Sequence, residues 1–75
     1  MNAKTKKILE DAERDGIPIF VLTAKDSNSL QTIRHYLREC SSDDCDIMHL
    51  DGIRERIAEF DEWQDANGEK VKYPN

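Results

Sequence analysis

All the cysteines and histidines of this 75-residue chain fall within residues 35–49. They are His35, Cys40, Cys45 and His49, and two thiolates with two imidazoles can form a tetrahedral zinc site. The spacing disfavours such a site, because His35 and Cys40 would point about 140° apart on the helix predicted there. The cysteines suit small apolar positions at a bend between helices. We therefore expect no metal ion and no other cofactor, with zinc at these four residues as the alternative.

Three aspartates, Asp43, Asp44 and Asp46, follow the first cysteine closely. Their carboxylates could attract a divalent cation, but they lack the alternating pattern of a calcium loop and its central glycine. Carboxylates also stabilise the positive end of a helix dipole. The aspartates therefore predict the capped start of a helix.

The segment Thr23–Ser29 has the chemistry of a small anion site, since hydroxyls and a lysine precede a predicted helix start. The residues that would bind the anion are Thr23, Lys25, Ser27, Asn28 and Ser29. The segment contains no glycine, so its backbone does not wrap phosphate as a P-loop does. Ordinary helix capping by Asp26 and Ser27 accounts for the same residues without a ligand, and both interpretations stay open at this stage.

An acidic row lies along the last predicted helix. Asp51, Glu55 and Glu59 follow one another at i,i+4 spacing, and Glu62 lies beside them. Like charges at that spacing repel, so the row does not serve helix stability. It predicts either a solvated face or a docking surface for a protein with a basic surface.

Five elements must position these residues. Hydrophobic spacing and capping signals predict helices over residues 3–15, 27–40 and 46–66, an extended segment over 17–23 and an extended tail over 70–74. Two matching apolar seams predict that the second and third helices form an antiparallel hairpin. The expected fold is mostly α with a minor α+β character, a single small domain of residues 1–75 in which three helices accompany one short apolar strand.

The run Ile17–Leu22 is the densest apolar stretch in the chain. Its β-branched and aromatic residues favour a buried strand, and a short helix starting at Pro18 is the competing prediction. A strand needs a backbone partner, which is either the tail or the same strand in another copy. We expect Phe20, Tyr36 and Trp63 to join the two seams in the core. Because one chain has little apolar mass, we also expect self-association through Ile19–Leu22 or an exposed seam.

Composition excludes several classes of protein. The chain has 16 acidic against 11 basic residues, a net charge of −5, and its acidic excess lies in residues 41–75. It offers no basic stripe for nucleic acid, no apolar run long enough for a membrane span, and no N-terminal signal, so a cytoplasmic protein is expected. No nucleophile, base and orienting residue can be combined, so we expect no enzyme.

Four short patterns carry a resemblance: Pro18-x-Phe20-x-Leu22-x-Ala24-x-Asp26, Ile33-Arg34-x-Tyr36, Glu62-Trp63 and Lys72-x-Pro74. Over most of residues 16–75 the chain resembles a loose family of short, uncharacterised bacterial and phage or prophage proteins. The resemblance implies a bacterial or phage setting and no activity, and it transfers no functional residue.

Together these features predict a small non-enzymatic protein-interaction module that self-associates and presents the acidic row to a partner. The alternative is a protein that sequesters a small anionic ligand or nucleotide at the Thr23–Ser29 turn.

Overall fold

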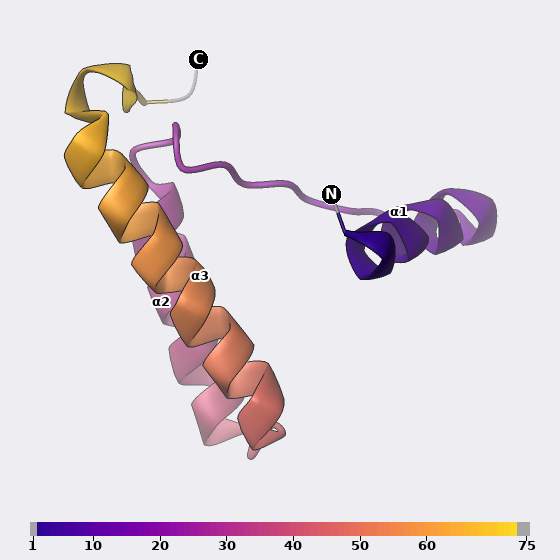
Figure 1. The fold of residues 1–75 in the computed structure, drawn as a ribbon. Coiled ribbons are helices and arrows are strands. Elements are labelled where there is room, and N and C mark those ends of the chain that lie inside the picture. Colours follow the sequence, from indigo (N-terminus) through magenta and orange to yellow (C-terminus); the bar gives the residue numbers. More distant parts are fainter. Residues whose placement is uncertain (1, 74–75) are drawn as a thin grey trace.

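The computed structural model describes residues 2–73 of the chain. It contains the helices α1 (Ala3–Asp15), α2 (Ser29–Ser42) and α3 (Ile47–Ala66) and the short 3₁₀ helix η1 (Gly68–Lys70). These residues form no sheet, and residues 17–23 are neither helix nor strand but run outstretched between α1 and α2 (Figure 1). The predicted mostly helical fold of three helices is therefore confirmed, with the apolar run as an extended segment.

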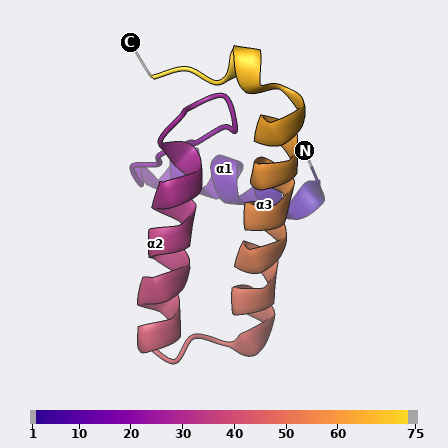
Figure 2. The same cartoon turned by 90° about the vertical axis from the view of Figure 1, so that its left-hand side faces the viewer.

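Helices α2 and α3 lie side by side and antiparallel, as predicted (Figure 2). Leu30 and Cys40 of α2 and Ile53 of α3 are buried between them. The other residues of the two seams are half-buried: Ile33, Leu37, Leu50, Ile57, Phe60 and Trp63. Two helices can cover each other along one stripe only, which leaves this core thin.

The helix predicted over 27–40 begins later, at Ser29, because the Ser29 amide and hydroxyl both donate to the Asp26 carbonyl, at 3.0 and 2.7 Å. These bonds hold the preceding residues in a turn. The same helix continues to Ser42, where the Ser41 hydroxyl bonds back along the helix to a carbonyl one turn earlier. Ser41 and Ser42, which are predicted to lie in the connection after the helix, thus belong to α2.

Helix α1 is capped at both ends by its own neighbours. The Asn2 side chain accepts the Thr5 amide at 2.8 Å, and Gly16 ends the helix at a φ of 66°, which favours glycine. The Ile17 amide then donates to the Ala12 carbonyl at 2.9 Å. The predicted bounds of this helix are confirmed.

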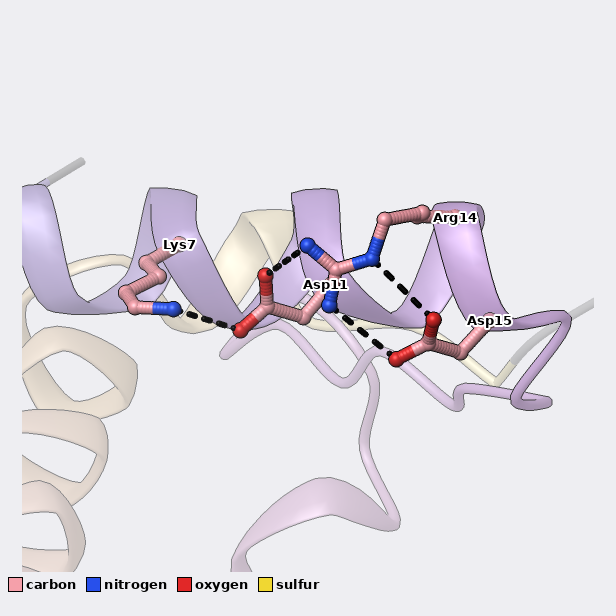
Figure 3. Close-up of polar contacts among 4 residues, drawn as sticks. All are labelled: Lys7, Asp11, Arg14 and Asp15. Carbon is pink, nitrogen blue, oxygen red and sulfur yellow. Dashed lines mark hydrogen bonds and ion pairs between the residues drawn. The ribbon is translucent and has the colours of Figure 1, made fainter.

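A ladder of ion pairs runs along the exposed side of α1 (Figure 3). Lys7 pairs with Asp11 at 2.8 Å, Arg14 approaches Asp11 at 3.2 Å, and Arg14 also donates to both carboxylate oxygens of Asp15. The pKa of Arg14 is raised, first of all by its hydrogen bond with Asp15. Every charge in this ladder is satisfied within the helix.

The C-terminal tail closes the open end of the hairpin. The Ser27 amide donates to the Lys72 carbonyl and the Lys72 amide donates to the Lys25 carbonyl, both at 2.9 Å, around an isolated parallel bridge between Asp26 and Lys72. The Gln64 side chain of α3 donates to the Ala24 carbonyl at 3.1 Å. We call these contacts the tail clasp.

The tail prediction is thus partly wrong. The tail does pair with the chain, but beside residues 25–27 instead of the apolar run. The predicted extended tail of residues 70–74 starts later, because Lys70 belongs to η1 and the extended backbone begins at Val71. Residue 74 lies outside the described part.

The fold is open, because α1 stands to one side of the hairpin (Figures 1 and 2). Within residues 2–73, the backbone of α1 contacts neither α2 nor α3, although Lys4 of α1 borders a hollow with residues of α3, among them Met48 and Gly52. The radius of gyration is 13.9 Å, whereas a compact domain of this length has about 11 Å. The accessible surface is 6265 Å², whereas a compact monomer of this mass exposes about 4,700 Å².

The prediction that Phe20 and Tyr36 lie in the core is therefore wrong. Phe20 is 83% exposed and Tyr36 is 51% exposed. Phe20 has nothing to pack on because its segment does not fold back onto the hairpin. Tyr36 lies beside the seam instead of within it. No helix in the described part of the chain has both the length and the apolar content needed to cross a membrane.

Candidate functional site

Three of the four candidate zinc ligands, Cys40, Cys45 and His49, lie around the bend of the hairpin. The Cys45 amide donates to the Cys40 carbonyl at 3.1 Å. The Tyr36 hydroxyl lies 3.3 Å from Nε2 of His49, and the two rings meet edge to face with centroids 6.1 Å apart. The bend is thus held by backbone and ring contacts.

The fourth residue, His35, is not part of this group. Its Nε2 lies 3.5 Å from Oε1 of Glu39, one turn along α2, and the side chain is exposed. In residues 2–73 no three His, Cys, Asp or Glu side chains come together in a way that could hold a metal ion. The four residues of the alternative zinc site are therefore not brought together.

Two groups at the bend hold their protons more tightly than usual. A hydrogen bond with the Cys40 side chain is the main cause that raises the pKa of Tyr36. Burial is the main cause that raises the pKa of the Cys45 thiol, and the neighbouring Cys40, Asp43 and Asp44 add to it. A thiol that keeps its proton is a poor nucleophile, so Cys45 is not activated as a nucleophile.

The three aspartates shape the turn between α2 and α3. Asp46 caps α3 by accepting the Met48 amide at 2.8 Å, as the sequence predicts. The Asp43 amide donates to the Glu39 carbonyl at 3.0 Å, and Asp44 adopts a positive φ of 56°. All three therefore have a structural role in this turn.

The predicted anion site divides into two parts. The Ser27 and Ser29 amides are used in the tail clasp and the helix start, and the Asn28 amide donates to Oδ1 of Asp26 at 2.8 Å. Ser29 is fully buried, and the Ser27 hydroxyl oxygen is buried with no hydrogen-bond partner in the described chain. The tail clasp and the turn at the start of α2 therefore use the backbone donors that an anion here would need.

Thr23 and Lys25 point elsewhere, into a hollow of about 620 Å³ between this turn and the tail. The residues around it are Thr23, Lys25, Asp26, Glu69, Lys70, Lys72 and Tyr73. None of its three lysines belongs to an ion pair among the described residues. We call Lys25, Lys70 and Lys72 the lysine trio. Lys70 and Lys72 have no local signal for this site in the sequence, because it is the tail clasp that brings them to Lys25.

The acidic row is less negative than its sequence suggests. All four of its residues are exposed, but Asp51 pairs with Arg54 at 3.0 Å and Glu59 pairs with Arg56 at 2.8 Å. Each arginine lies three residues from its partner, so both pairs form along the helix itself. In the described chain the row keeps Glu55 and Glu62 as its unpaired carboxylates.

The extended segment between α1 and α2 has large apolar side chains that are exposed to solvent. Ile17 and Ile19 are 56% and 55% exposed, and the values reach 83% for Phe20 and 68% for Val21. Large apolar side chains in a row are thus open to solvent over a stretch that the described chain leaves uncovered. We call residues 17–22 the apolar segment. Contiguous exposed apolar surface of this kind marks binding sites.

Comparison of the chain with known protein families, curated proteins and solved structures gives no match.

Proposed function

We propose that this chain is a small, non-enzymatic protein-interaction module whose binding element is the apolar segment. One observation carries the proposal: Ile17, Ile19, Phe20 and Val21 are exposed on a stretch that residues 2–73 leave open to solvent. Burial of a side chain such as phenylalanine contributes about 1.5–3 kcal/mol to association. A partner that covers the segment therefore gains free energy that the isolated chain does not.

The acidic row on α3 offers a second surface for a protein partner. Glu55 and Glu62 have no ion-pair partner in the described chain, so they attract a basic protein surface most strongly. In the setting that the sequence resemblance implies, the partner is a bacterial or phage protein.

The experiment compares two substitutions that place the same charge at equally exposed apolar residues. Phe20 and Met48 are 83% and 80% exposed, but Met48 lies on α3, away from the apolar segment. The wild-type chain, Phe20→Asp and Met48→Asp are immobilised sparsely, incubated with bacterial lysate, and the retained proteins are identified by mass spectrometry.

We expect Phe20→Asp to lose proteins that the wild type and Met48→Asp retain. Circular dichroism checks that all three chains have the same helix content. Equal retention by the three chains would contradict the proposal.

A second candidate function is the capture of a small anion or nucleotide, which the convergence of the lysine trio on one hollow favours. ATP and inorganic pyrophosphate are the probes, and the measurement is the thermal shift. If the hollow binds anions, Lys72→Ala removes the shift and Lys4→Ala, on α1, preserves it. The absence of any shift, or a shift that survives Lys72→Ala, excludes this function.

A further inference from the structure

The backbone of the apolar segment has no partner. From residue 17 to residue 23, in the chain as described, backbone hydrogen bonds occur only at the two ends. There the Ile17 amide donates to the Ala12 carbonyl and the Thr23 carbonyl accepts the Asp26 amide. The donors and acceptors between them are free on both edges, as in an unpaired strand that can add to another.

We propose that a second copy of this chain pairs with the apolar segment as an antiparallel strand, across a two-fold axis at Phe20. The inference rests on the proposed function, since it takes the apolar segment as a binding element, and it commits to the partner. An isologous contact needs a self-complementary surface, and a strand that is apolar along its whole length provides one.

Proline sets the edge and the register of this pair. In an extended strand, successive residues direct their N–H and C=O groups to opposite edges. Pro18 has no N–H, so the edge that it shares with Phe20 and Leu22 lacks a donor. The opposite edge is complete at Ile19 and Val21. Pairing through that edge leaves Pro18 facing outward at no cost.

When the pair is centred on Phe20, every free backbone N–H and C=O group on this edge has a hydrogen-bond partner. Ile19 then exchanges both backbone bonds with the partner's Val21, and the free Thr23 amide reaches the partner's Ile17 carbonyl. The two Phe20 residues face each other at a non-hydrogen-bonded position, where side chains come closest. A shift of the register by one pair in either direction leaves some of these groups without a free partner.

The surface area fits the demand of a dimer. The chain exposes 6265 Å², on the order of 1,500 Å² more than a compact monomer of the same mass. A specific interface of standard size buries roughly 800 Å² on each partner. Each copy therefore has enough excess surface for such an interface, and the apolar segment lies at its centre.

Charge supports the same arrangement. Antiparallel pairing around Phe20 ends with residue 17 of one copy beside residue 23 of the other, so the C-terminal end of α1 lies near the partner's turn that begins at residue 24 and bears a lysine of the trio. Of the four carboxylates in residues 10–15, Asp11 and Asp15 are held by Lys7 and Arg14, whereas Glu10 and Glu13 form no ion pair among the described residues, and the end of a helix adds a negative dipole. The lysine trio forms no ion pair within residues 2–73. The crossing thus places opposite charges together.

The first test is the mass of the full chain in solution by light scattering and native mass spectrometry, from about 1 μM to about 200 μM. We expect a concentration-dependent rise from 8.7 kDa to twice that mass. A chain that remains monomeric throughout, or that forms a different oligomer, overturns the proposal.

The second test measures the register. Phe20→Cys and, as matched control, Ile19→Cys are prepared with Cys40 and Cys45 both changed to Ala. In the proposed register the Cα atoms of the two residues 20 lie about 4.5 Å apart, within the range of a disulfide, and those of the two residues 19 lie beyond about 7 Å. In a glutathione redox buffer we expect Phe20→Cys to form the linked dimer at least tenfold more readily. Equal or reversed yields overturn the register.

The outcomes separate this inference from the proposed function. A monomeric chain that still retains lysate proteins through Phe20 overturns the second copy as partner and leaves the proposed function standing. A dimer with the expected crosslink, in a chain that retains no other protein, supports the second copy and removes the heterologous partner.

Discussion

The amide of Ser27 and the carbonyl of Lys72 are joined by a hydrogen bond of 2.9 Å that links the start of α2 to the tail after α3. Helices α2 and α3 bury only a narrow stripe of apolar residues, so their open end gains much from this link. Gln64 reinforces it from α3 by donating to the Ala24 carbonyl at 3.1 Å and approaching Ser29 Oγ at 3.4 Å.

Removal of the Gln64 side chain should weaken the tail clasp. Gln64→Ala leaves the part-buried Ala24 carbonyl without its donor, which costs about 1–2 kcal/mol of the free energy of unfolding. The measurement is the midpoint of urea unfolding. Gln31→Ala, at an exposed position of α2, serves as control and should change the free energy of unfolding by less than about 0.5 kcal/mol. Equal effects of the two variants would show that the clasp contributes nothing.

Because Leu30 is buried and Phe20 is exposed, alanine substitution of the two residues should change the free energy of unfolding by different amounts. Leu30 is 9% exposed in the hairpin core, so Leu30→Ala should lower the free energy of unfolding by about 2–4 kcal/mol. Phe20→Ala should change it by less than about 0.5 kcal/mol at concentrations where the chain is monomeric. Urea unfolding of both variants checks the difference. A loss of several kcal/mol for Phe20→Ala in the monomer would mean that the apolar segment packs on its own chain.

Two glycines should respond to alanine with opposite signs. Gly16 has a φ of 66°, so Gly16→Ala strains the end of α1 by about 1 kcal/mol and lowers helix content. Gly52 lies inside α3 with open space around its Cα, so Gly52→Ala should stabilise the chain by about 0.5–1 kcal/mol. Circular dichroism and urea unfolding measure the two effects. The same sign for both would refute the account of α1 termination.

Alkaline pH should destabilise the hairpin bend. The folded chain raises the pKa of Cys45 and Tyr36 above their ordinary values of 9.0 and 10.0. The folded state therefore holds these protons longer than the unfolded state, and the slope of the free energy of unfolding against pH is negative. This stabilisation is complete below the ordinary values and is lost as pH rises through the raised ones.

Urea unfolding from about pH 8 to about pH 11 measures this loss. Cys45→Ala and Tyr36→Phe should each make the decline less steep. A free energy of unfolding that stays constant or rises over this range would contradict the prediction.

Charge reversal should distinguish members of the acidic row. Glu55 has no ion-pair partner in the described residues, whereas Glu59 is held by Arg56 at 2.8 Å. If a basic protein docks on the row, Glu55→Lys should weaken its capture at least as much as Glu59→Lys does, and high salt should weaken it further. Retention on immobilised chains provides the measurement. A bound protein that ignores both substitutions does not use this surface.

The sequence predicts those parts of the fold that have local signals. Asn2 and Gly16 lie directly at the ends of α1, and the observed helix begins and ends where these two residues place it. The seams of α2 and α3 are visible because their spacing repeats over several turns. The hairpin follows from the match between the two seams.

Contacts between distant residues have no such signal. Nothing near Gln64 indicates that its amide reaches Ala24, or that Lys70 and Lys72 would join Lys25. The apolar residues around Phe20 predict that it is buried, but they do not indicate which residues it packs against. Phe20 is exposed because its segment does not fold back onto the hairpin, and no local pattern determines that placement.

In the described chain the hydrogen bonds and ion pairs of α1 lie between residues 2 and 17, from the Asn2 cap through the ion-pair ladder to the Ile17 amide. Its contact order is therefore very low, and such a helix forms and melts within about a microsecond. Thirteen residues are about the shortest length that persists alone in water. Helix α1 can thus unwind and re-form while the hairpin of α2 and α3 stays intact.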